Sequence, residues 1–122
     1  MAQHILVVDD DPGIRDVVTM VLRDEGFPVA TATNGRQALA SITAARPELV
    51  LLDLNMPVMT GWEVLSQLQA ALAGIPVVVM TAAQGGQAEA QRCHADGYLG
   101  KPFDLEDLLT VVERCLRRGS AT

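Results

Sequence analysis

Short, nearly continuous apolar runs alternate along the chain with segments in which apolar residues recur every three or four positions. The runs predict five β-strands, over residues 4–9, 28–32, 48–53, 75–81 and 97–100. The segments of helical period predict five helices, over residues 11–26, 34–46, 62–72 and 86–95 and from residue 104 onward. No linker, repeat or low-complexity segment separates these elements.

The first helix has clear start and stop signals. Asp11 is a good N-cap, and Pro12 fits the first turn, where its missing N–H is harmless. Gly26 marks the end of the helix. The apolar stripe consists of Ile14, Val17, Val18, Val21 and Leu22. The helix is therefore expected to begin immediately after the first strand.

Alternation of strands and helices is typical of a parallel sheet covered by helices on both faces. The third and fourth strands are apolar almost throughout, as expected of central strands buried on both sides. We therefore predict a single doubly wound α/β domain over residues 1–122, in which residues 119–122 form a C-terminal tail. In such sheets ligands bind beyond the carboxyl ends of the strands.

Composition narrows the classes of function. The chain is 49% hydrophobic, which indicates a globular fold, and its net charge of −6 argues against unaided binding to nucleic acid or an anionic membrane. The start carries no secretory signal, and the apolar runs are too short to cross a bilayer. Cys93 and Cys115 fit no metal or redox spacing, so we expect reduced thiols in a cytoplasmic protein.

Several reactive polar residues stand where predicted strands end. An acidic run at residues 9–11 ends the first strand, and Asp53 ends the third. Thr81 ends the fourth strand, and Lys101 directly follows the fifth. Because the carboxyl ends of parallel strands share one edge of the sheet, we expect these groups to converge.

This set of groups predicts phosphoryl chemistry assisted by a metal ion. Clustered carboxylates repel one another unless a cation joins them, and oxygen-only ligands favour a hard ion such as Mg²⁺. Lys101 would add a positive charge for an anion, and Thr81 could donate a hydrogen bond to it. One aspartate would then be available as a nucleophile.

Each of these residues also has a simpler explanation. The acidic run could cap the first helix, Asp53 could cap the loop after it, Thr81 could merely end a strand, and Lys101 could be a surface charge. None of these explanations accounts for all four positions falling on one sheet edge. Their coincidence is what favours a functional site.

The motifs around these residues resemble those of the receiver domain of two-component response regulators, the fold typified by the bacterial chemotaxis response regulator. They are "ILVVDDDP", "LVLLDLNMPVMTG", "VVVMTA" and "GYLGKPF", in that order along essentially the whole chain. The resemblance implies a flavodoxin-like (βα)5 fold. Its parallel five-stranded sheet has the order 2-1-3-4-5 and helices on both faces.

The resemblance also implies a role for the acidic residues. Asp53 matches the aspartate that accepts a phosphoryl group from the phosphohistidine of a histidine kinase. Asp10 matches a direct Mg²⁺ ligand, and Asp9 a ligand acting through water. Asn55 matches the position whose backbone carbonyl completes the metal site, and Mn²⁺ is an alternative ion.

The remaining residues match the family's switch. Thr81 and Lys101 correspond to residues that contact the phosphoryl oxygens, and Tyr98 to the aromatic ring that turns inward as Thr81 moves. In the family this change alters the face formed by helix four, strand five and helix five. The chain would thus be a signalling domain that assists only its own phosphorylation and dephosphorylation, not an enzyme acting on other substrates.

The resemblance defines the expected partners as well. A sensor histidine kinase or a histidine phosphotransfer protein would supply the phosphoryl group. The output would pass to a downstream protein or to an effector domain outside this sequence. The chain would be a monomer or a phosphorylation-dependent homodimer.

Three other interpretations use parts of the same pattern. A haloacid dehalogenase-like phosphatase also has an aspartate nucleophile and Mg²⁺, but it would want a second acid where Asn55 stands. A flavodoxin-like FMN carrier would want a hydroxyl-rich loop after the first strand and flanking aromatics, whereas aromatic residues make up only 3% of this chain. A degenerate receiver would act as a binding module without phosphorylation.

Overall fold

The computed structural model describes residues 4–53, 74–81, 96–100 and 103–120, with only the backbone of Thr81 and of residues 117–120. The described strands and helices follow one another in the order β1 (Ile5–Val8), α1 (Pro12–Asp24), β2 (Val29–Ala32), α2 (Gly35–Ala44), β3 (Leu49–Asp53), β4 (Val77–Thr81), β5 (Gly97–Gly100) and α5 (Leu105–Ser120). Each coincides with an element that the sequence predicts. The helices expected over 62–72 and 86–95 lie outside the described residues.

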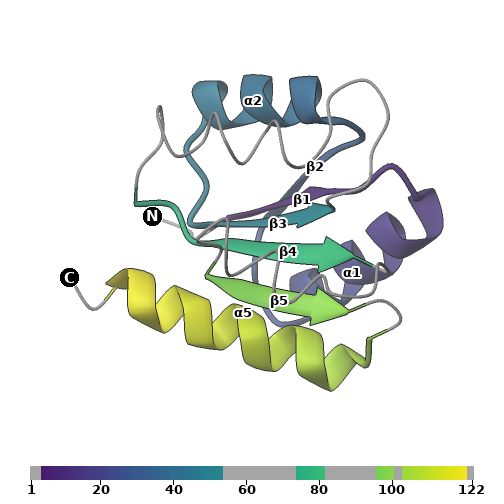
Figure 1. Cartoon of the computed structure of the whole chain (residues 1–122), viewed down its shortest axis with the longest axis vertical. Helices are drawn as coiled ribbons and strands as arrows, with labels where there is room; N and C mark the ends of the chain where they lie inside the picture. Colours follow the sequence, from purple (N-terminus) through teal and green to yellow (C-terminus); the bar gives the residue numbers. More distant parts are fainter. Residues whose placement is uncertain (1–3, 54–73, 82–95, 101–102, 121–122) are drawn as a thin grey trace.

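The five strands form one sheet in the order β2-β1-β3-β4-β5. All four neighbouring pairs are parallel. Figure 1 shows α2 over one face of this sheet and α1 and α5 over the other. The doubly wound parallel fold and the strand order implied by the family resemblance are therefore confirmed.

Alternate residues of each strand enter two separate core layers, because successive side chains of a strand point to opposite faces. Leu6, Val8, Val50 and Leu52 pack in the layer beneath α2. Ile5, Val7, Leu49 and Leu51 pack in the layer beneath α1 and α5. Residues of both β1 and β3 are buried along their whole length, which explains why these strands read as continuous apolar runs.

The start of α1 follows the predicted capping pattern. Asp11 is the N-cap, and its Oδ1 accepts hydrogen bonds from the backbone N–H groups of Gly13 and Ile14, at 2.9 and 3.3 Å. Pro12 occupies the first helical position, where no N–H is needed. Gly26 has a φ of 94°, a left-handed conformation that glycine adopts without strain, so it ends the helix as expected.

Replacing Asp11 with Ala is expected to lower the free energy of unfolding by about 1 kcal/mol, because two N–H groups of the first turn lose their acceptor. The matched control is Asp16→Ala, which removes an exposed aspartate from the interior of the same helix. Urea unfolding followed by circular dichroism measures both variants. A loss in the control as large as that in Asp11→Ala would contradict the capping role.

Two apolar side chains, one on α1 and one on α5, are more exposed than the hydrophobic pattern of their helices suggests. Val17 on α1 is 44% exposed, although it belongs to the predicted apolar stripe of that helix. Leu105 at the start of α5 is 45% exposed, although it begins a series of apolar residues at helical spacing. Conversely, Cys115 is buried in α5 and shares the core layer of that helix. The helix continues to Ser120, two residues into the segment assigned to the tail.

None of the helices described in the structure is long and apolar enough to span a membrane.

Candidate functional site

The site lies where β1 and β3 end at the carboxyl edge of the sheet. These central strands are paired in register up to Val8 and Leu52. The next residue of each strand is an aspartate, Asp9 after β1 and Asp53 at the end of β3. Parallel pairing therefore brings two carboxylates that are far apart in the sequence to adjacent positions.

Asp10 joins these two residues. One carboxylate oxygen from each of Asp9, Asp10 and Asp53 lies within 4.8 Å of the others. Asp9 is fully buried and Asp53 is 4% exposed, whereas Asp10 is exposed. Three carboxylates at this spacing repel one another, and burial increases the cost. Their oxygen atoms are the donors that Mg²⁺ prefers, so this acidic cluster fits such an ion.

Backbone and side-chain contacts fix Asp9 within the acidic cluster. Its N–H donates to the carbonyl of Ala32 at 3.1 Å, which extends the pairing of β1 with β2 by one residue. Its Oδ1 accepts from the N–H of Asp11 at 2.9 Å. Nη1 of Arg15 donates to its carbonyl oxygen, also at 2.9 Å. Asp9 is thereby held from the strand, from the turn and from the helix that follows.

Sequence reasoning missed the contribution of Arg15. The residue stands four positions after the N-cap Asp11, so both lie on the same side of the first turns of α1. That side faces the acidic run, and the guanidinium reaches the Asp9 carbonyl. The sequence signal for this contact was a basic residue one turn after the N-cap, in a helix that begins beside a cluster of acidic residues.

The predicted switch residues occupy β4 and β5. Thr81 is the last residue of β4 and pairs with Gly100 of β5. Two residues back, Val79 pairs with Tyr98, whose side chain is half-buried and packs against the core layer beneath α2. The sheet therefore carries Thr81 to the same edge as the acidic cluster and places Tyr98 two residues before the end of the adjacent strand.

Two other predicted site residues, Asn55 and Lys101, lie outside the described part of the chain, as do Cys93 and the segment 62–72. Their roles stay predictions. Among the residues that are described, the structure brings together the three carboxylates of the acidic cluster.

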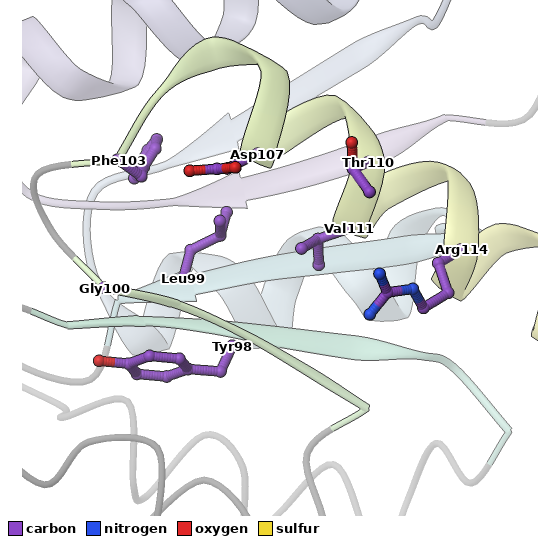
Figure 2. Close-up of a pocket in the computed structure, with 8 residues that line it drawn as sticks. All are labelled: Tyr98, Leu99, Gly100, Phe103, Asp107, Thr110, Val111 and Arg114. Carbon is purple, nitrogen blue, oxygen red and sulfur yellow. The ribbon is translucent and has the colours of Figure 1, made fainter.

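An open pocket of about 300 Å³ lies between β5 and α5 (Figure 2). Its lining comes from the strand, from Phe103 and from the first turns of the helix, and includes Asp107 and Arg114. β5 is an edge strand of the sheet. In Figure 2 Leu99 points toward α5 and the ring of Tyr98 lies on the other side of the strand.

The family model, the related sequences and the solved structures that this chain matches all indicate the same family. Residues 5–113 match the model of the response regulator receiver domain. The DNA-binding response regulator MtrA of Mycolicibacterium smegmatis is 43% identical over 97% of this chain and 52% of its own length. The transcriptional regulatory protein PrrA of Mycobacterium bovis is 41% identical over 98% of this chain and 52% of its own. The chain thus spans about half the length of these curated relatives.

Solved structures give the same result. The chemotaxis protein CheY4 of Vibrio cholerae superposes with a TM-score of 0.84 at 36% identity, over 94% of this chain and 99% of that one. A CheY-like receiver domain protein from Methanospirillum hungatei gives a TM-score of 0.90 at 29% identity, over 98% and 97% of the two chains. These relatives are signalling proteins. Similarity to them over nearly the whole chain favours the receiver over the phosphatase and FMN-carrier interpretations. The chain belongs to the response regulator receiver domain family of two-component signalling.

Proposed function

We propose that this receiver domain is phosphorylated on Asp53 and that Mg²⁺ is required for the reaction. The observation that carries the proposal is the acidic cluster, in which Asp53 ends the buried central strand beside Asp9 and Asp10. The strand carries the nucleophile to the carboxyl edge of the sheet, which is where ligands bind in folds of this kind.

The donor in the cell would be a phosphohistidine of a sensor histidine kinase or of a histidine phosphotransfer protein. A carboxylate oxygen of Asp53 attacks phosphorus, and the P–N bond breaks with its electron pair passing to the imidazole nitrogen. The product is an acyl phosphate on Asp53, which water later hydrolyses to the carboxylate and inorganic phosphate. The aspartate is regenerated, so the chain acts as a signalling component and not as an enzyme on a separate substrate.

Asp10 would bind the ion directly, Asp9 through water, and the carbonyl of Asn55 would complete the set with Asp53. When bound, Mg²⁺ supplies positive charge that offsets repulsion between the carboxylates and the incoming phosphoryl group. Mn²⁺ is an alternative of similar ligand preference. Arg15 supports the site by holding the Asp9 backbone.

Thr81 and Lys101 would contact the phosphoryl oxygens and pass the change to Tyr98. The output face would comprise β5, α5 and the segment 86–95, and would control a partner protein or an effector domain. The names of two relatives describe DNA binding and transcriptional regulation. An effector domain that regulates transcription would be one target of this output face. We place this signalling in the cytoplasm, with the chain a monomer or a phosphorylation-dependent homodimer.

Incubation with Mg²⁺ and acetyl phosphate is the experiment that tests this function. We expect the intact mass to increase by one phosphoryl group, with the adduct mapped to the peptide that contains Asp53. Chelating the metal with EDTA should abolish the adduct, because it removes the cation that offsets repulsion between the carboxylates and the incoming phosphoryl group. Asp10→Asn should reduce the adduct strongly, because it removes a proposed ligand of that cation.

The control is Asp24→Asn, which changes the same functional group at the exposed far end of α1. It should be phosphorylated like the wild type. An unmodified wild type in the presence of Mg²⁺ would instead support a degenerate receiver that signals by binding alone.

A further inference from the structure

The ring of Tyr98 lies along β5, directly over Gly100. The two residues are two positions apart in a strand and so share one face of the sheet. A Cβ atom placed on Gly100 would lie 2.8 Å from Oη of Tyr98, 3.4 Å from Cζ and 3.5 Å from Cε2. Figure 2 shows the hydroxyl end of the ring extending toward Gly100, on the side of the strand away from α5. The tyrosine thus occupies the space that a side chain at position 100 would need.

The backbone does not explain why position 100 is glycine. Among the described residues, the glycines with positive φ are Gly26 and Gly74. Gly100 is instead a regular strand residue that pairs with Thr81, so any L-amino acid could adopt its backbone conformation. Larger residues are ordinarily preferred in strands, and glycine weakens them. The close approach of the tyrosine ring is the physical reason for glycine at this position.

The clash created by a side chain would move the ring and not the strand. Separations under 3.0 Å are essentially never seen for a real Cβ, so one of the two groups must shift. The nearest atom is the far end of a side chain with two rotatable bonds, whereas the Gly100 backbone is fixed by its pairing with β4. Tyr98 is only half-buried and lies on an edge strand. Rotation of the ring away from the strand is therefore the cheaper response.

The position of the ring matters because of what lies next to it. Gly100 pairs with Thr81, and the residue before Thr81, Met80, pairs with Asp53. The ring therefore lies over the residue that pairs with Thr81, and Thr81 directly follows the residue that pairs with Asp53 of the acidic cluster. We propose that Gly100 is a positioning residue, whose lack of a side chain allows the Tyr98 ring to lie against β5 and so sets the resting state of the switch. The inference about ring position stands on the structure, and its link to signalling rests on the proposed function.

The test uses the fact that Tyr98 is the single tyrosine of the chain. Incorporation of 3-fluorotyrosine gives a ¹⁹F NMR signal from this ring alone. In metal-free, unphosphorylated Gly100→Ala we expect a displaced resonance and stronger broadening by a soluble paramagnetic reagent, because the ring moves toward solvent. The free energy of unfolding should remain close to that of the wild type. A wild-type resonance with wild-type broadening would overturn the proposal.

Gly97→Ala is the matched control, since it adds the same methyl group to the same strand. Its Cβ would lie 3.0 Å from Val111 Cγ1 and 3.2 Å from Cys115 Sγ, both on α5. This variant should lower stability and leave the fluorine resonance of a folded sample unchanged. Displacement of the resonance by Gly97→Ala to the same extent would show that the signal reports general loosening of β5, and would also overturn the proposal.

A second measurement separates ring position from phosphorylation. Adding Mg²⁺ and acetyl phosphate is expected to shift the wild-type resonance, and this shift should be smaller in Gly100→Ala, where the ring has already moved. Failure of Asp53 phosphorylation would remove the ligand-dependent shift from both proteins, yet the difference between them without ligand would persist. Loss of that difference alone would contradict the role of Gly100.

Discussion

Replacing Asp53 with Asn is expected to abolish phosphorylation by acetyl phosphate while leaving the chain folded. The amide has nearly the shape of the carboxylate, but its oxygen lacks the negative charge that makes Asp53 a nucleophile. Asp53 is buried at the end of β3, and removing one of three clustered carboxylates reduces their repulsion. The free energy of unfolding in metal-free buffer should therefore be equal to or higher than that of the wild type. Intact mass and urea unfolding measure the two effects.

The informative comparison is between Asp53→Asn and Asp24→Asn, which alter the net charge equally. Only the first removes a carboxylate from the acidic cluster, so only the first should lose the phosphoryl adduct. A phosphoryl adduct on Asp53→Asn as abundant as that on the wild type would place the acceptor elsewhere. A large drop in stability would point to a structural role for the carboxylate, because its hydrogen-bond and charge partners would then outweigh the repulsion.

The described strands and helices could be predicted because the local sequence pattern of each element agrees with the burial of its residues in the fold. β1 and β3 are buried on both faces, so their sequences carry the uninterrupted apolar run that is expected of a central strand. The capping geometry of Asp11 and the turn at Gly26 depend on the residues themselves and on their immediate neighbours, and both were found from sequence. Parallel strand order then brought Asp9 and Asp53 to one edge.

Features that depend on packing were not predictable in the same way. Val17 and Leu105 satisfy the helical period, yet the pattern does not show how much of each side chain stays exposed once its helix has packed. The contact between Tyr98 and Gly100 depends on a rotamer and on the space around it, neither of which a sequence records. The reach of Arg15 to the Asp9 carbonyl likewise requires the angle between α1 and β1.

The strand that carries Asp53 should also be a part of the core where truncation of a side chain is costly. Leu51 of β3 is fully buried beneath α1 and α5, on the same face of the sheet as Asp53, and pairs with Val7 and Val78. Leu51→Ala is expected to lower the free energy of unfolding by about 3–5 kcal/mol, from lost burial and from the cavity that remains. This is a large part of the total of about 5–15 kcal/mol typical of a domain.

The control for Leu51 is the same substitution at Leu105, which is 45% exposed and should change stability by only about 0.5 kcal/mol. Urea unfolding of both variants gives the difference directly. Equal losses would mean that β3 is not packed as the structure shows, and the rigid support for Asp53 would be lost with it. If Leu51→Ala is much less stable yet its folded fraction still forms the phosphoryl adduct, burial of β3 determines how much protein is folded. The acidic cluster would then determine the chemistry, and the two contributions of this strand could be measured separately.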